Sequence, residues 1–276
     1  MPGLFIFIQK IKMFIDIHSH VDICKDIDVL IKNAKKENVK ILTAGTSPKS
    51  NRKILELKEK YPEINICLGI YPIDALKLSE KEKTRNFFIN SSSGKSQIKE
   101  IDSEIEFIKK NKSNILGIGE VGLDLKHAKE ETLEIQKENL TKFVNLAREL
   151  NVPVVIHSRK AEKECIELLE KLNYNKIIMH CFSGNMKLVD KIIKNNWSLS
   201  IPANVKHSEH FQKIVEKTPI KQLFCETDSP FLHPDKKFPN EPSNVIESYK
   251  KISEIKKICL DEVERIIEGN YNELFS

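Results

Sequence analysis

The sequence predicts a single (β/α)₈ TIM barrel on three observations. Short apolar runs rich in β-branched residues recur along the 276-residue chain, and amphipathic stretches separate them. Most of these runs are continuously apolar, as in parallel strands that are covered on both faces. There are eight such runs, and eight strand–helix units are what this barrel requires. A doubly wound open sheet is the alternative, but no GxGxxG follows the first run, and no linker or repeat divides the chain.

The elements are expected in regular order. The clearest helix spans 131–150, where apolar residues fall on one stripe. Two intervals between strands are longer than the rest: one contains the polar run 90–97, expected as a loop between two helices, and the other contains helix 131–150. The expected strands are 14–17, 39–44, 64–70, 114–119, 152–156, 176–179, 198–201 and 222–226.

Composition limits the class of protein. Hydrophobic residues make up 40% of the chain and charged residues 31%, which gives a globular domain with a sizeable core and excludes a disordered or collagen-like chain. The formal net charge is only +5, from 45 basic and 40 acidic residues. That excess is too small to indicate nucleic-acid binding by bulk electrostatics, so a phosphate ligand would need a local site.

Location is predicted from cysteines and apolar runs. Six scattered cysteines without a CxxC pair predict reduced thiols and a cytoplasmic protein. No run approaches the roughly 20 apolar residues of a membrane span. The apolar stretch 4–8 has no basic region before it, which argues against a signal peptide. Because Met13 precedes the first strand, we hypothesise that residues 1–12 are a dispensable extension of a 13–276 domain. The sequence shows no obligatory protein partner.

Histidines and carboxylates stand where strands are expected to end. His18 and His20 close the first strand, and the period of two places them on one side. Two converging imidazoles make half of a metal site, although HxH alone is a weak signal. Glu120, His157, His180 and Asp228 follow the fourth, fifth, sixth and eighth strands. At the C-terminal mouth of a barrel, where barrel enzymes place their chemistry, such residues converge. Six ligands exceed one tetrahedral zinc and suit two divalent cations bridged by a carboxylate.

The ordered motifs resemble those of the TatD-like metal-dependent deoxyribonucleases, within the amidohydrolase-type barrels. The resemblance extends from Met13 to the end of the chain, and includes the helix 136–150 and Asn-Glu-Pro at 240–242. The matching motifs are IDIHSHVD at 15–22, GEVGLD at 119–124, PVVIHSR at 153–159, HCFSG at 180–184 and ETDSP at 226–230.

The resemblance implies roles for these residues. One metal would be bound by His18, His20 and Asp228, and a second by His157 and His180, with Glu120 bridging the two. Glu120 and Asp228 are the predicted catalytic residues, Asp228 as the acceptor that takes or orients the proton of a metal-activated water. Arg159 would meet a substrate phosphate, which its planar fork suits. Asp16 and Asp22 flank the first two histidines and are expected to orient them.

Two positions depart from the family pattern. Relatives commonly carry Gly-x-His-Pro-His after the third strand, whereas Tyr71 and Ile73 stand at the histidine positions here. Tyr71 is the predicted substrate contact at this loop, either stacking on a base or donating to a phosphate. Pro239 stands where relatives often have an arginine before Asn-Glu-Pro, so one basic substrate contact is expected to be lost.

The expected enzyme is a metal-dependent hydrolase of phosphodiester bonds, with DNA as the favoured nucleic-acid substrate. Four histidines favour a transition ion or zinc, whereas the resemblance favours magnesium, so magnesium, manganese and zinc all stay open. An ester or amide hydrolase on the same site, such as a D-aminoacyl-tRNA deacylase, is the first alternative. A barrel that binds a partner without catalysis is the second.

Overall fold

The computed structural model describes residues 13–79 and 100–276, and there the chain forms one sheet of eight parallel strands in sequence order. Just beyond β8, the Asp228 amide donates to His18 O at 2.9 Å and the His20 amide donates to Ser229 O at 2.8 Å, which joins β8 to β1. The predicted barrel is therefore confirmed. Its strands are β1 Phe14–Ser19, β2 Val39–Ala44, β3 Ile64–Leu68, β4 Gly117–Asp124, β5 Val154–Arg159, β6 Ile177–Met179, β7 Ser198–Pro202 and β8 Leu223–Glu226.

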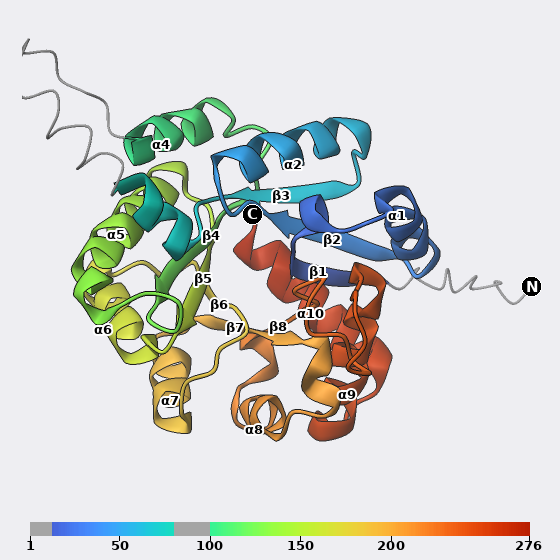
Figure 1. Ribbon diagram of the computed structural model, residues 1–276. Helices are drawn as coiled ribbons and strands as arrows, with labels where there is room; N and C mark the ends of the chain where they lie inside the picture. Colours follow the sequence, from blue (N-terminus) through green and yellow to red (C-terminus); the bar gives the residue numbers. More distant parts are fainter. Residues whose placement is uncertain (1–12, 80–99) are drawn as a thin grey trace, which may run out of the picture.

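Helices surround the strands on the outside of the barrel (Figure 1). Residues 72–79 are also helical. The expected helix 131–150 is present as α5, preceded by a short 3-10 turn. The helices are α1 Ile27–Lys36, α2 Pro48–Lys60, α4 Glu100–Lys110, α5 Leu133–Leu150, α6 Glu162–Leu172, α7 Met186–Lys194, α8 Glu209–Lys217, α9 Ile246–Lys256 and α10 Leu260–Leu274.

Two strands extend further toward the mouth than expected. The sequence predicts strands at 114–119 and 152–156, whereas β4 ends at Asp124 and β5 at Arg159. The glycines of β4 are poor strand formers, and polar residues such as His157 are typical of loops, so both segments resemble loops by propensity. Pairing continues nonetheless as far as Asp124 with Arg159. Glu120 and His157 therefore lie inside strands, where the backbone holds them more firmly than a loop would.

The end of α10 closes the barrel opposite the mouth. Tyr271 stacks on Phe275 with ring centroids 4.6 Å apart, and Phe275 lies edge-on to Phe224 near the start of β8. Lys40, near the start of β2, places its Nζ 4.9 Å from the Tyr271 ring. Lys176, just before β6, donates to Ser276 O at 3.2 Å. Phe224, Lys40 and Lys176 lie at, or just before, the N-terminal ends of their strands, so the end of α10 and the two residues after it form the floor of the barrel.

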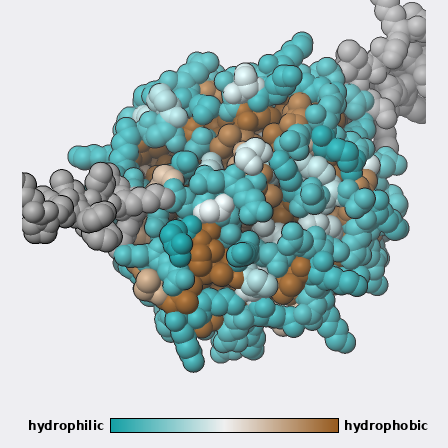
Figure 2. Space-filling model, turned by 180° about the vertical axis from the view of Figure 1, so that it is seen from behind, coloured by the Kyte–Doolittle hydropathy of each residue, from teal (hydrophilic) through white to brown (hydrophobic). Residues whose placement is uncertain are grey.

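The outer surface is largely hydrophilic on the face seen from behind, with hydrophobic side chains showing between polar ones (Figure 2). Within 13–79 and 100–276, no helix is long and apolar enough to cross a bilayer. The proposed extension 1–12 and the expected loop 90–97 both lie outside the described residues.

Candidate metal centre

The barrel mouth brings together all six predicted ligands. Three sets of ligand atoms each lie within 4.8 Å of one another. Five of the six residues are buried, and the Asp228 side chain is only 16% exposed. The three sets are His18, His20 and Glu120; His18, His180 and Asp228; and Glu120, His157 and His180.

Glu120 stands between two pairs of imidazoles. Its Oε1 lies 2.7 Å from His157 Nδ1 and 3.1 Å from His180 Nε2. Its Oε2 lies 3.4 Å from His20 Nε2 and 3.8 Å from His18 Nε2. One carboxylate thus presents a different oxygen to each pair, which is the arrangement that a bridging ligand requires.

Asp228 faces the pair on β1. Its Oδ1 lies 3.3 Å from His20 Nε2 and 3.7 Å from His18 Nε2. The residue has a φ of +53°, a left-handed conformation that aspartate tolerates better than most residues. The hydrogen bond from its amide to His18 O holds that conformation beside the β1 histidines.

His18 supplies the test of whether a cation fits. The residue is fully buried, and neither ring nitrogen has a hydrogen-bond partner among the described residues. Burial and the neighbouring His180 and His20 rings hold the pKa of His18 well below its usual value, so the ring is neutral. An unpartnered buried imidazole is costly. A cation beside Nε2 would satisfy it, so the donor set fits a metal.

The β5 and β6 histidines are backed by buried carboxylates. His157 Nε2 lies 3.2 Å from Asp124 Oδ2, so Nδ1 faces Glu120. His180 Nδ1 lies 3.5 Å from Glu226 Oε2, so Nε2 faces Glu120. Such outer carboxylates fix the tautomer and orientation of a metal-binding imidazole.

Asp124 is the centre of a larger hydrogen-bond network. Its Oδ2 accepts from the Tyr71 hydroxyl at 2.6 Å and lies 2.9 Å from His127 Nδ1. Its Oδ1 accepts from the amides of Lys126 and His127 at 2.8 and 2.9 Å. Burial raises the pKa of Asp124, but hydrogen bonds from His157, His127 and Tyr71 outweigh burial and hold it well below its usual value. The carboxylate is therefore ionised.

Gly122 allows β4 and β5 to approach each other at this point. Its φ is +157°, and a Cβ added there would lie 1.8 Å from His157 O. Any side chain would push His157 away from both Glu120 and Asp124. The glycine in GEVGLD is thus needed for packing beside a predicted ligand.

The expectation that Asp16 and Asp22 orient the rings of His18 and His20 is wrong, because neither carboxylate bonds either ring among the described residues. From these two histidines, Asp16 Oδ1 accepts only the His18 backbone amide, at 3.4 Å. Asp16 accepts from Thr227 N at 2.8 Å and Thr227 Oγ1 at 2.6 Å, so it ties β1 to the segment after β8. Asp22 accepts from Ser50 Oγ at 2.7 Å. The carboxylates that face imidazoles are Asp124 and Glu226 instead. Residue spacing was the available signal: Asp124 is four residues after Glu120, and Glu226 is two before Asp228.

A cavity of about 780 Å³ opens above the centre. Arg159 and Tyr71 line it, so both predicted substrate contacts have access to a ligand there. The Tyr71 hydroxyl is already donated to Asp124, and its ring lies edge-on to His157 at 4.9 Å. Their contact with substrate stays a prediction.

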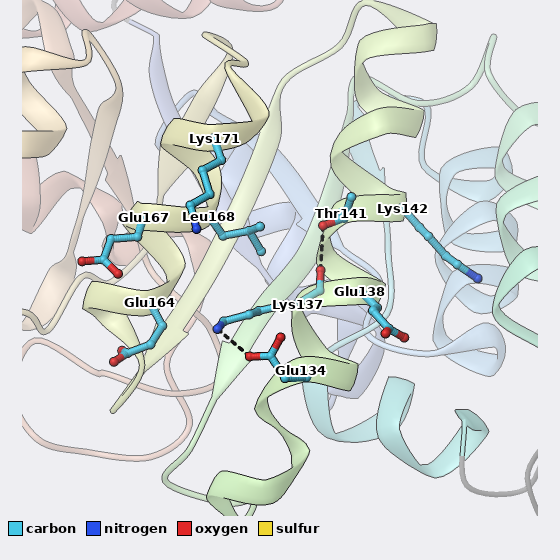
Figure 3. Close-up of a pocket in the computed structure, with 9 residues that line it drawn as sticks. All are labelled: Glu134, Lys137, Glu138, Thr141, Lys142, Glu164, Glu167, Leu168 and Lys171. Atoms are coloured by element: carbon cyan, nitrogen blue, oxygen red, sulfur yellow. Dashed lines mark hydrogen bonds and ion pairs between the residues drawn. The ribbon is translucent and has the colours of Figure 1, made fainter.

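A second hollow lies between α5 and α6 (Figure 3). Its lining is glutamates and lysines with one threonine and one leucine, and Lys137 pairs with Glu134 at 2.7 Å. Charges of both signs interleave there, as on a solvated helical surface.

A closed barrel with imidazoles and carboxylates gathered at its mouth defines a metal-dependent hydrolase. The model of the family "TatD related DNase" matches residues 15–276, and the chain belongs to this family. The predicted resemblance is therefore confirmed.

Relatives match over nearly the full chain. "Uncharacterized metal-dependent hydrolase MJ1582" of Methanocaldococcus jannaschii is 35% identical over 266 residues, covering 95% of this chain and 96% of that protein. Human "Deoxyribonuclease TATDN3" is 32% identical over 269 residues, covering 95% and 94%. The crystal structure of YJJV, a TatD homologue from Escherichia coli K12, superposes with a TM-score of 0.81 at 21% identity, covering 95% and 97%, and shows the shared fold.

Proposed function

We propose that the protein hydrolyses phosphodiester bonds of DNA at this centre with two divalent cations, which are magnesium, manganese or zinc. The observation that carries the proposal is Glu120, whose two carboxylate oxygens face separate pairs of imidazoles. One pair with Asp228 would hold the first cation, and the other pair would hold the second. The deoxyribonuclease name of the human relative supports DNA as the substrate.

Cations at this centre, when bound, lower the pKa of a coordinated water to about 7 and neutralise charge on the phosphodiester oxygens. The chain supplies the remaining functions. Glu120 is buried among four imidazoles, and although burial raises its pKa, His180 and His157 hold the pKa well below the usual value. It is therefore an anion that balances cationic charge and keeps the two halves of the centre together.

Asp228 is the proposed proton acceptor. Its Oδ1 faces the same space as the β1 histidines, and it is the predicted ligand with the most exposed side chain described here. It can therefore reach both the reacting water and bulk solvent. Arg159, on the cavity wall at the end of β5, would bind a phosphate oxygen and orient the substrate.

Cleavage of labelled single-stranded DNA in the presence of magnesium, manganese or zinc tests the proposal. We expect metal-dependent cleavage by the wild type, and a loss of about 100- to 1000-fold in Glu120→Ala and Asp228→Asn, as when other groups that stabilise transition-state charge are removed. Full activity in either variant contradicts the assigned roles. Failure to cleave DNA despite two bound ions per chain points to ester or amide substrates, beginning with D-aminoacyl-tRNA.

Two further proposals concern the whole chain. We infer that residues 13–276 form the catalytic domain and that 1–12 are dispensable, so a chain beginning at Met13 should match the full chain in the same assay. We also infer a cytoplasmic location, since all six cysteines are free. Recovery of the protein outside the cytoplasmic fraction of its cells contradicts that location.

A further inference from the structure

Four large hydrophobic side chains are exposed within the described ranges, and two of them border the catalytic cavity. Ile23 is 55% exposed and Phe231 is 46% exposed, and both line the cavity above the metal centre. Val29, 56% exposed, and Phe238, 73% exposed, are absent from that lining. Single exposed apolar residues are ordinary on a protein surface, but these two border one cavity and are accessible to a ligand bound there.

Backbone hydrogen bonds fix both residues relative to the centre. The Ile23 amide donates to His20 O at 3.2 Å, and the Phe231 amide donates to Asp228 O at 2.9 Å. Each apolar residue is thus three positions beyond a predicted ligand of the same metal. The His20 amide donates to Ser229 O, so the two turns lie against each other. Ile23 and Phe231 therefore line the same side of the cavity, beside the β1 half, and we call this pair the apolar rim.

The wall of the cavity opposite the apolar rim carries a cation and hydrogen-bonding groups. Arg159 ends β5, and in the strand order β5 stands across the barrel from β1. Ser158 and His127 also line the cavity. A ligand spanning the mouth would meet a cation and hydrogen-bonding groups at one end, the metal centre in the middle and the apolar rim at the other end. A nucleotide unit has this sequence of properties: anionic phosphates joined through a sugar to a flat, largely apolar base.

We propose that the apolar rim binds the nucleobase next to the phosphodiester bond being cleaved, with the Phe231 ring stacking on the base and Ile23 packing beside it. The inference rests on the proposed phosphodiesterase function and deepens it, because it assigns a specificity role to two residues outside the metal centre. Base–aromatic stacking changes affinity by about 5- to 150-fold per base. Phe231 is half exposed, so the lower end of that range applies.

Steady-state kinetics with two substrates test the rim. One is a single-stranded oligonucleotide, and the other carries abasic tetrahydrofuran residues in place of its nucleotides while keeping every phosphate. In Phe231→Ala we expect KM for the normal oligonucleotide to rise about fivefold or more, with kcat little changed and KM for the abasic one unaltered. Phe231→Trp should keep wild-type KM, whereas Phe231→Leu should resemble Phe231→Ala, because it stays apolar but lacks a ring.

Matched controls use the exposed residues away from the cavity. Phe238→Ala and Val29→Ala should leave both substrates unaffected, whereas Ile23→Ala should raise KM for the normal oligonucleotide only. An equal rise for both substrates in Phe231→Ala, or wild-type KM in that variant, overturns the proposal. Full retention of affinity in Phe231→Leu shows that the rim binds any apolar group, and also overturns base stacking.

Direct binding separates this inference from the proposed function. Fluorescence anisotropy with metal-loaded wild type, and with both oligonucleotides made with cleavage-resistant phosphorothioate linkages, should show tighter binding of the normal oligonucleotide than of the abasic one, and Phe231→Ala should remove the difference. Absence of cleavage in the wild type refutes the proposed function and the placement of the base beside a cleaved bond, whereas preferential binding of the normal oligonucleotide still supports the rim as a base site. Equal binding of both oligonucleotides by the wild type refutes the rim as a base site, whether or not cleavage occurs.

Discussion

The two halves of the metal centre are built differently behind their imidazoles. On β5 and β6, His157 and His180 each face a fully buried carboxylate, Asp124 or Glu226. At the end of β1, the His20 Nδ1 lies 3.1 Å from the Ala44 carbonyl oxygen, and His18 Nδ1 has no partner in the described part of the chain. The carboxylate of the β1 half, Asp228, instead stands in front, on the side of the ligand atoms.

The two kinds of carboxylate therefore have different proposed roles: Asp124 and Glu226 position metal-binding imidazoles, whereas Asp228 takes part in catalysis. A carboxylate behind an imidazole can fix its orientation and raise its basicity, but it cannot reach substrate. Asp228 is partly exposed and faces the cavity, so it can exchange a proton with a reacting water and with solvent. We therefore expect substitutions of Asp124 or Glu226 to change mainly metal affinity, and substitutions of Asp228 to change mainly turnover.

The largest expected effect is the pH dependence of metal affinity. His18 and His20, at the end of β1, should contribute to it unequally. Burial lowers the pKa of His20, but hydrogen bonds with Asp228 and Glu120 outweigh burial and raise it to about 10. The protonated ring stabilises the metal-free fold below about pH 6.5, and this contribution is lost as pH rises toward 10. A cation needs the neutral ring, so affinity should rise about 100-fold per displaced proton between pH 6 and 8.

Competition with a chelator of known pH dependence measures this slope. His18 is already neutral, so His18→Ala should weaken binding without changing the slope. His20→Ala should lower the slope by one displaced proton. The remaining slope comes from His157 and His180, where burial is again outweighed by neighbouring carboxylates that raise the pKa. If metal affinity does not depend on pH after correction for the chelator, the assignment of a protonated His20 and a neutral His18 is contradicted.

Removing the charge behind His157 should have the next largest effect. In Asp124→Asn we expect metal affinity of the β5–β6 half to fall about 10- to 100-fold, because the amide no longer offers an anionic acceptor to His157. Glu226→Gln should have a similar but smaller effect, since Glu226 lies farther from its imidazole. Metal stoichiometry by mass spectrometry and isothermal titration would show one weakened site. Asp22→Asn is the control, because that carboxylate bonds Ser50; an equal loss in this variant would contradict the assignment.

The smallest effect is expected at Tyr71. Tyr71→Phe removes one donor to Asp124 but leaves His127 and two amides in place. A hydrogen bond to a charged group contributes about 1.5–3 kcal/mol, and the remaining donors reduce the loss, so metal affinity should fall about threefold to tenfold. Tyr71→His, which restores a donor, should recover part of it. Tyr61→Phe, which removes a donor to the distant Asp28, should leave metal binding unchanged. A rise in KM or a fall in kcat without any change in metal affinity would assign Tyr71 to substrate instead.

Strand order and the convergence of ligands followed from local patterns in the sequence. The run 39–44 is continuously apolar except for Lys40 and Thr43, and β2 has the predicted bounds. The ends of β4 and β5 could not be predicted from local patterns, because pairing between strands overrides the loop-like propensity of glycine and histidine. Local sequence also misassigned Asp16 and Asp22. Adjacency to a histidine in the chain says little about which carboxylate faces its ring, since the partner comes from another strand: Asp124 of β4 faces His157 of β5, and Glu226 of β8 faces His180 after β6.

The floor formed by α10 has a practical consequence for handling the protein. The C-terminal residues lie against the N-terminal strand ends, at the far end of the barrel axis from the cavity. A tether attached after Ser276 would therefore orient the molecule with its mouth toward solution. Immobilised in that way, the protein would present every copy of its cavity to a long polymeric substrate in the same direction.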